Sequence, residues 1–140
     1  MDFKIINFDE GIFDLNHEIS LPKDREVSIT VRLLPIFRYS TSSEIVVCQL
    51  TLKYSFEDND LLTYGFAVAV AAKGWKEFIN TNPEKDAIVS QIYGAWNASI
   101  NAGRGVLIDK TKDTEFKQFL IPDIPEDKLK TILRIEKIEE

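Results

Sequence analysis

Two stretches in the first half of the chain alternate apolar and polar side chains with a period of two residues. The apolar positions are Val27, Ile29, Val31 and Leu33 in the first stretch and Cys48, Leu50, Leu52, Tyr54 and Phe56 in the second. Successive side chains of a strand point to opposite faces, so this pattern predicts two strands with one buried face each. The polar, hydroxyl-rich residues 38–44 suit a loop between antiparallel neighbours. The chain is therefore constrained to a sheet that is covered on one side.

Two further strands are predicted beside this pair. Residues 62–72 follow an acidic turn at residues 57–60 and are rich in β-branched and small side chains, with Gly65 as the expected site of a bulge. Residues 3–8 predict a short strand at the edge of the sheet. Together these segments predict a four-stranded antiparallel sheet.

The second half of the chain changes to a helical period. Asn82 and Pro83 are typical of a helix start, and apolar side chains then recur every three or four residues from Ile88 to Ile100. Glycines in residues 103–105 predict the end of this long helix, and residues 106–108 resemble an extended segment. A last helix is predicted from Pro125 into the charged tail. We expect an α+β fold in which a long helix and a C-terminal helix pack on one face of the sheet, as a single domain over residues 1–140.

Charge and composition exclude several classes of function. The chain has 17 Lys and Arg against 23 Asp and Glu, a net charge of −6, which argues against nucleic acid or an anionic membrane as partner. The longest nearly apolar run, residues 66–72, is far shorter than the roughly twenty residues that span a bilayer. A single cysteine, Cys48, excludes an intramolecular disulfide. With no positively charged start before an apolar run, we expect a cytoplasmic protein.

No motif in the sequence predicts an enzyme, a cofactor or a metal site. The only histidine, His17, has no partner at a recognisable spacing, and Cys48 lies in the apolar register of a strand, where thiols behave as small hydrophobes. The glycines of residues 103–105 end a predicted helix, whereas a phosphate loop opens one. We expect neither catalysis nor a bound cofactor or metal.

Large aromatic side chains are more numerous than one face of a thin sheet easily hides. They are Phe37, Tyr39, Tyr54, Phe56, Tyr64, Phe66, Trp75, Phe78, Tyr93 and Trp96. Two interpretations stay open: some of them line an exposed groove or a subunit interface, or all of them belong to an ordinary core.

The order of the predicted elements resembles the family of SecB, the protein-export chaperone, and its divergent relatives. The likeness spans nearly the whole chain: residues 26–31 and 44–52 are similar to the second and third strands of the family, and the acidic turn 57–60 precedes a fourth. The most specific piece is Arg104-Gly105 followed by Leu120 and Pro122, which is similar to the Arg-Gly link to a Leu-x-x-Pro stretch in the family.

The resemblance implies a function without catalysis. It implies an ATP-independent chaperone that holds unfolded polypeptides in a hydrophobic groove and forms a tetramer, built as a dimer of dimers through edge strands and first helices. The implied groove residues are Tyr54, Phe56, Tyr64, Phe66 and Trp75. The implied interface residues are Phe3, Ile5, Ile92 and Trp96, with Trp96 in either the interface or the groove. The acids Glu57, Asp58 and Asp60 stand where the family contacts the translocase motor SecA.

Two departures from the family limit what the resemblance implies about a contact with SecA. Residues 109–117 form an extra polar stretch, and the C-terminus lacks the basic, metal-associated contact of classical members. The alternative is a non-catalytic oligomeric accessory or structural protein that docks one specific folded partner.

Overall fold

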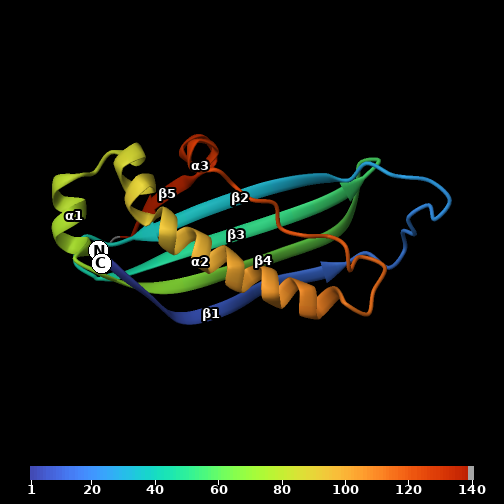
Figure 1. Cartoon of the computed structure of the whole chain (residues 1–140), viewed down its shortest axis with the longest axis horizontal. Helices are drawn as coiled ribbons and strands as arrows, with labels where there is room; N and C mark the ends of the chain where they lie inside the picture. The colour runs from blue at the N-terminus through green and yellow to red at the C-terminus, as the bar shows by residue number, and fades with distance from the viewer. Residues whose placement is uncertain (139–140) are drawn as a thin grey trace.

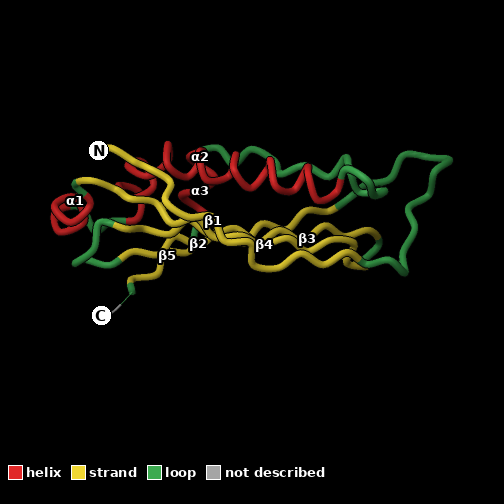
Figure 2. Tube along the Cα trace, turned by 90° about the horizontal axis from the view of Figure 1, so that it is seen from below, coloured by secondary structure: helices red, strands yellow, loops and turns green. Residues whose placement is uncertain are grey.

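The computed structural model describes residues 1–138 and consists of one sheet with helices on a single face. Its elements, in chain order, are β1 (Asp2–Leu15), β2 (Thr30–Tyr39), β3 (Ile45–Phe56), β4 (Asn59–Lys73), α1 (Trp75–Thr81), α2 (Lys85–Thr111), α3 (Glu126–Ile132) and β5 (Arg134–Lys137). Figure 1 shows α2 lying diagonally across the sheet, with α1 at one end. Figure 2, which views the sheet along its edge, shows α2 and α3 on one side and no helix on the other.

The sheet has five strands in the order β1-β4-β3-β2-β5. Strands β1 to β4 are antiparallel neighbours, as predicted, but β5 pairs in parallel with β2. The prediction of a four-stranded, purely antiparallel sheet is therefore wrong. Residues 134–137 were expected to extend the last helix, but Leu133 already has extended backbone. The outer edge of β2 offers this segment hydrogen-bonding partners that a free helix end lacks, and the N–H of Ile138 donates to the carbonyl of Tyr39 beyond the last pair.

Helix α2 continues past the glycines at which it was predicted to end. Residues 106–108, expected to be extended, are helical, and Leu107 and Thr111 are buried. Gly103 has a packing role, because a Cβ built on it would overlap the ring of Phe66 on β4. The glycine therefore allows a close approach of helix and sheet and does not break the helix.

Strand β1 is longer than predicted and carries the irregularities of the sheet edge. Its register against β4 shifts between Ile5 and Asn7 and again between Glu10 and Phe13. The bulge expected at Gly65 is thus an extra residue on β1, and Gly65 lies on the strand opposite it. A Cβ on Gly65 would lie 3.0 Å from Cγ2 of Ile12, so the glycine leaves room for that side chain.

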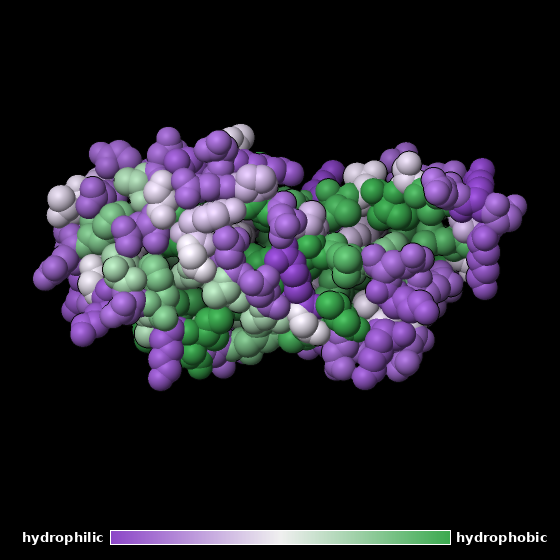
Figure 3. All heavy atoms as spheres, in the orientation of Figure 1, coloured by the Kyte–Doolittle hydropathy of each residue, from purple (hydrophilic) through white to green (hydrophobic). Residues whose placement is uncertain are grey.

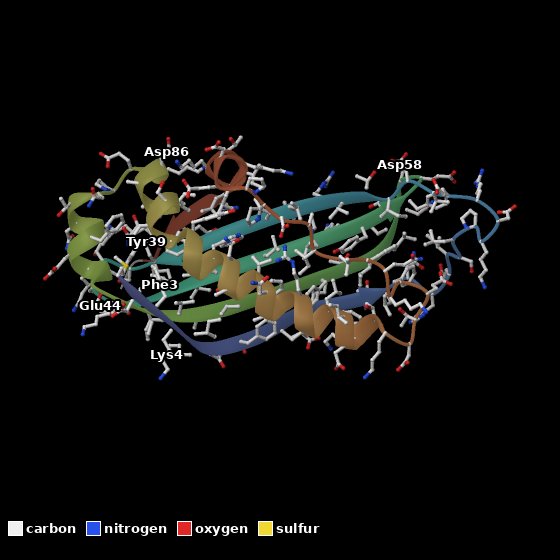
Figure 4. The ribbon with its side chains drawn as sticks, in the orientation of Figure 1. Phe3, Lys4, Tyr39, Glu44, Asp58 and Asp86 are labelled. Atoms are coloured by element: carbon white, nitrogen blue, oxygen red, sulfur yellow. The ribbon has the colours of Figure 1, made fainter. Side chains whose placement is uncertain are left out.

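A short helix, α1, was not predicted and closes one end of the sheet. It follows Gly74, whose φ of 92° is left-handed, the region that glycine adopts without strain. The carboxylate of Glu44, in the loop before β3, accepts hydrogen bonds from the backbone N–H groups of Gly74 and Lys76 at 3.2 and 2.9 Å. Figure 4 shows Glu44 beside this helix. A side chain distant in sequence thus satisfies the free N–H groups at the start of α1.

The core lies between the helix-bearing face of the sheet and a layer made by α2, α3 and residues 116–124. Every second residue of β3 and β4 points into it, and α2 adds Ile88, Ile92, Trp96 and Ile100. Phe116, Phe119, Ile121 and Ile124 extend the core beyond the end of α2. The segment after α2 is therefore part of the packed structure.

Candidate functional site

A cavity of about 780 Å³ is lined mainly by two connecting segments, one before β2 and one after α2. Figure 1 shows both segments at the end of the sheet remote from α1. One wall comes from the long connection between β1 and β2, and the other from the segment that follows α2. Its lining residues are Leu21, Pro22, Lys23, Arg25, Glu26, Val27, Ile29, Val31, Tyr54, Glu115, Gln118, Phe119 and Leu120. Figure 3 shows hydrophobic side chains gathered over this end of the molecule within a hydrophilic border. We call this cavity the end groove.

The apolar floor of the end groove is held in place by Tyr54 on β3. Its ring stacks on Phe119 with centroids 5.0 Å apart, and its hydroxyl donates to the carbonyl of Leu120 at 2.8 Å. Burial raises the pKa of Tyr54, so the phenol stays neutral at physiological pH. Tyr54 thus fastens the segment after α2 to the sheet and shapes the groove.

The rim of the end groove carries charges of both signs. Lys23, Arg25, Glu26 and Glu115 surround an interior supplied by Val27, Ile29 and Leu21. An apolar floor with mixed charge at its edge suits an extended chain that buries alternate side chains and keeps its polar groups near water.

A neighbouring cavity of about 530 Å³ lies between α2 and the same following segment. Arg104 spans it: Nε donates to the carbonyl of Ile121 at 3.1 Å, and another guanidinium nitrogen pairs with Asp123 at 2.7 Å. Leu120, 60% exposed, lies between this cavity and the end groove and lines both. Arg104 therefore positions the segment that forms one wall of the end groove.

The residues predicted to line a groove occupy different places. Tyr54 lies at the wall of the end groove but is only 1% exposed, and Phe56 is half-buried near the following turn. Tyr64, Phe66 and Trp75 are almost fully buried in the core. The Tyr64 hydroxyl donates to the carbonyl of Gly103, Phe66 stacks on Phe8, and Trp75 packs on Phe37 and Tyr39. These three side chains are therefore inaccessible to a peptide, and almost none of Tyr54 is accessible either.

The residues predicted to form an oligomer interface also divide into two groups. Phe3 and Ile5 lie on the edge strand β1, half-buried and 39% exposed respectively. Ile92 and Trp96 lie on the side of α2 that faces the sheet and are fully buried within the chain. Their burial leaves a different side of α2, with Gly94, Asn97 and Ala98, toward solvent.

Two of the three predicted partner-contact acids form an exposed two-residue turn between β3 and β4. Glu57 and Asp58 have φ angles of 50° and 65°, the left-handed values that such hairpins require. The third, Asp60, is the second residue of β4 and accepts a hydrogen bond from Ser55. Figure 4 places Asp58 at the end of the sheet opposite Glu44. All three carboxylates are accessible.

Sequence reasoning missed most of the end groove. Val27 and Ile29 were assigned to a strand, but β2 begins only at Thr30, so they belong to the connection that precedes it. Phe119 lies after a polar stretch and was assigned no role. The apolar pair Phe116 and Phe119 within polar surroundings was the available signal that this segment returns to the core.

The cysteine and the histidine, the side chains most often used in catalysis, occupy positions that do not suggest a catalytic role. Cys48 is buried, and desolvation raises the pKa of its thiol to about 12. His17 is exposed and lines, with Asp60, a third cavity of about 400 Å³. Within residues 1–138, no three His, Cys, Asp or Glu side chains gather in a way that could hold a metal ion. No helix of that same region is long and apolar enough to cross a membrane.

Comparison with known proteins finds a similarity of structure but none of sequence. No protein-family model matches the chain, and no curated protein shows significant similarity to it. Its structure is similar to that of a SecB-like chaperone of Mycobacterium tuberculosis in complex with a ChAD peptide from the HigA1 antitoxin. The TM-score is 0.60 with 10% sequence identity, over 88% of this chain and 91% of that chain. The chain therefore has a SecB-like fold.

Proposed function

We propose that this protein is an ATP-independent, SecB-like chaperone that holds unfolded or partner polypeptides without catalysis. The observation that carries the proposal is the end groove, an open cavity of about 780 Å³ that apolar side chains and charged side chains of both signs line together. The structural neighbour was solved with a peptide from a partner protein, which supports polypeptide as the class of ligand. Leu120, 60% exposed, and the half-buried Val27 and Ile29 are the accessible apolar lining of the proposed binding site, and the buried rings of Tyr54 and Phe119 support this lining from beneath.

Of the other residues predicted to line a groove, only Phe56 is placed where it could contact a bound polypeptide. We propose that Phe56 contributes to binding at the margin of the site, because it is half-buried on the same strand as Tyr54. Tyr64, Phe66 and Trp75 would then act indirectly, by holding β4 and α1 in the core.

Assembly and location belong to the same proposal. A tetramer formed as a dimer of dimers would use β1, with Phe3 and Ile5, and the solvent side of α2. Ile92 and Trp96 would support such an interface from beneath, since they fix α2 on the sheet. A lone buried cysteine suits the reducing cytoplasm.

A contact between the turn acids and SecA is a separate proposal. Exposure of Glu57, Asp58 and Asp60 supports it, because a rim charge influences association without a role in folding. Reversal of Glu57 and Asp58 to Lys should weaken SecA binding while the urea midpoint stays the same. If the variant binds SecA as strongly as wild type does, these acids do not contact SecA.

The test of the holdase function uses a reduced, unfolded polypeptide and two matched variants. Ile29→Glu places a charge in the end groove, whereas Ile138→Glu places the same charge after β5, where Ile138 is 44% exposed. We expect wild type to capture the unfolded chain but not its folded form, Ile29→Glu to bind at least tenfold more weakly, and Ile138→Glu to bind as wild type does. Native mass spectrometry and fluorescence anisotropy measure these effects, and far-UV circular dichroism checks folding.

Two results would contradict the proposal. Capture that is unaffected by Ile29→Glu would move the binding site away from the end groove. Failure of wild type to bind any unfolded chain, together with binding of one folded protein, would favour the alternative of an accessory protein that docks a single partner.

A further inference from the structure

Part of the outer edge of β2 has no neighbouring strand within residues 1–138. Strand β2 begins at Thr30, but β5 pairs only with residues 36–39. Figure 1 shows β5 and α3 beside one half of β2 and neither of them beside the half nearest to the end groove. The tetramer proposed above would use β1, at the opposite edge of the sheet, so it leaves this part of β2 uncovered. We call residues 30–35 along this outer edge the free edge.

Alternate residues of the free edge direct their backbone groups outward. In a strand, the N–H and C=O of one residue point to one side, and those of the next residue point to the other side. The carbonyl of Tyr39 accepts a hydrogen bond from the N–H of Ile138, on the side of β5, at 2.6 Å. Odd-numbered residues of β2 therefore point away from β3. By this alternation, the outward groups of the free edge belong to Val31, Leu33 and Pro35.

A hydrogen bond beside β3 gives the same alternation independently. The N–H of Ala72 on β4 donates to the carbonyl of Glu44 at 2.6 Å, so even-numbered residues of β3 point to β4 and odd-numbered ones point to β2. The register pairs those odd-numbered residues with even-numbered residues of β2, which thus complete the ladder between the two strands. On the outer side of β2, the N–H and C=O groups of Val31 and Leu33 meet no strand, turn or loop partner within the described chain.

Pro35 separates the free edge from β5. Proline has no N–H, and this position directs the missing donor outward, so a neighbouring strand cannot pair fully with it. Strand β5 begins opposite the next residue, Ile36. Val31 and Leu33, which keep both groups, remain between Pro35 and the start of β2. Because each of them offers one donor and one acceptor, the free edge can hold an added strand of about three to five residues.

Side chains of an added strand would reach the end groove. Val31 lines the groove, and Leu33 packs against the core on the same face of the sheet. Every second side chain of an added strand would lie on this face, where Leu120, 60% exposed, supplies apolar surface. The remaining side chains would lie beside Arg32 and Leu34, which are exposed on the opposite face. The site thus suits a segment with apolar residues at alternate positions and tolerates polar residues between them.

We propose that the end groove holds a short extended segment of its polypeptide ligand as an added strand on the free edge, hydrogen-bonded to the backbone of Val31 and Leu33. This inference rests on the proposed chaperone function and specifies how, and over what length, the ligand is held. The chain itself supports this occupant, because β5 already joins the same edge as a strand of four residues. Backbone hydrogen bonds give affinity without reading side chains, which suits a protein that binds many unfolded chains.

Backbone-methylated peptides test these hydrogen bonds. The probe is a fluorescein-labelled peptide that alternates valine with threonine over about eight residues, between terminal lysines. One derivative carries N-methyl groups on its valines, and a matched derivative carries them on its threonines. With the valines over the groove, only one of the two sets of N–H groups faces β2: that of the valines in an antiparallel strand, and that of the threonines in a parallel one.

One methylated derivative should therefore bind wild type at least tenfold more weakly than the probe, because it loses the N–H groups that face β2. The other should bind within about twofold of the probe, because its methyl groups point away from the sheet. Fluorescence anisotropy measures all three affinities. The identity of the weaker derivative also gives the direction of the bound strand.

A pair of variants tests the same edge from the side of the protein. Val31→Pro removes one outward N–H group, and Val31→Ala shortens the same side chain but keeps that group. Because Pro35 already occupies an outward position of this strand, Val31→Pro should keep the fold, which far-UV circular dichroism checks. Val31→Pro should bind the probe at least fivefold more weakly than Val31→Ala.

Four results would overturn the inference, and the last of them also contradicts the proposed function. Equal binding of the two methylated derivatives would show that side chains alone hold the ligand. Capture of a reduced, unfolded polypeptide without binding of the probe would show that a short segment is not enough. A lower oligomeric mass of Val31→Pro, with unchanged binding of the probe, would assign the free edge to a second copy of the chain. If wild type binds neither the probe nor the unfolded polypeptide, the chaperone function fails as well.

Discussion

At the scale of single residues, Gly103 determines how closely α2 approaches the sheet. Its missing side chain is replaced in the packing by the ring of Phe66, which is held in turn by Phe8 and Tyr64. The chain offers natural controls on the same helix, because a Cβ on Gly94 or Gly105 would meet nothing within 4 Å.

Gly103→Ala should lower the free energy of unfolding by about 1–3 kcal/mol, since overpacking outweighs the roughly 1 kcal/mol by which alanine favours a helix. Gly94→Ala and Gly105→Ala should each raise it by roughly 0.5–1 kcal/mol. Urea unfolding measures all three. Equal stabilisation by all three changes would show that Phe66 moves aside freely.

Glu44 gives the stability of the protein a dependence on pH. The backbone N–H of Lys76, with a smaller contribution from Gly74, lowers the pKa of Glu44 from its usual value of 4.5. The pKa of Glu44 is lower in the folded state than in the unfolded state. The stabilisation by Glu44 is therefore fully present at a pH above the unfolded-state pKa, and it is lost as the pH falls through the folded-state pKa.

Glu44→Gln should therefore be less stable than wild type at pH 7, and the two proteins should converge as the pH falls below about 4.5. Urea midpoints at pH 7 and about pH 3 measure this difference. Glu18→Gln is the control, because Glu18 lies on the surface and its carboxylate makes no ion pair in the described chain. If the difference in urea midpoint between Glu44→Gln and wild type is the same at both values of pH, the charge of Glu44 does not contribute to stability.

At the scale of elements, Arg104 connects α2 to the segment that forms one wall of the end groove. The ion pair with Asp123 is exposed and contributes little, but the hydrogen bond to the carbonyl of Ile121 is partly buried. A hydrogen bond from a charged donor typically contributes about 1.5–3 kcal/mol.

Arg104→Met keeps the apolar stem and removes these donors, so the segment after α2 should open more often. The amide of Phe119, which donates to the carbonyl of Phe116, should exchange with solvent about tenfold faster or more. Lys112→Met, which removes only an exposed pair with Asp109, should change nothing. Unchanged exchange at Phe119 in Arg104→Met would show that Tyr54 alone fastens this wall.

The elements differ in how far local sequence predicts them. Strands β2 to β4 were found because alternation at positions such as Leu50 and Leu52 is a local signal of one buried face. The predicted end of the long helix and the predicted helix over residues 134–137 were wrong, because both parts of the structure depend on distant residues. Phe66 gives Gly103 its role, and the free edge of β2 turns the charged residues Arg134–Lys137 into a strand.

The candidate site was predictable only in part for the same reason. Aromatic content indicated a surplus of large side chains, but it could not separate Tyr54, at the end groove, from Tyr64, under Gly103. The groove depends on residues 21–31 and 115–120 meeting at one end of the sheet. Neither segment has a regular period that would indicate such a meeting.

At the scale of the whole molecule, a single hydrophobic core spans the sheet, α1, α2, α3 and the segment between α2 and α3. Its two tryptophans lie in different parts of that core. Trp75 packs at one end on Phe37 and Tyr39, while Trp96 lies within α2, and both are fully buried. One contiguous core predicts that the chain unfolds as a unit.

Single-tryptophan variants test this cooperativity. Trp75→Phe leaves only Trp96 as a fluorophore, and Trp96→Phe leaves only Trp75. In each variant, urea transitions followed by fluorescence and by far-UV circular dichroism should coincide. Loss of the Trp75 signal before the loss of secondary structure would show instead that the α1 end opens as a separate unit.

The parallel pairing of β5 with β2 has a consequence for synthesis of the chain. Tyr39 and its partner Lys137 are separated by roughly 100 residues, which a ribosome takes about 5–20 s to add. Throughout that interval the outer edge of β2 has no partner from its own chain, even after β3 and β4 have been added and can form the rest of the sheet. Each newly made molecule therefore passes through a period in which it needs protection from strand addition by its neighbours.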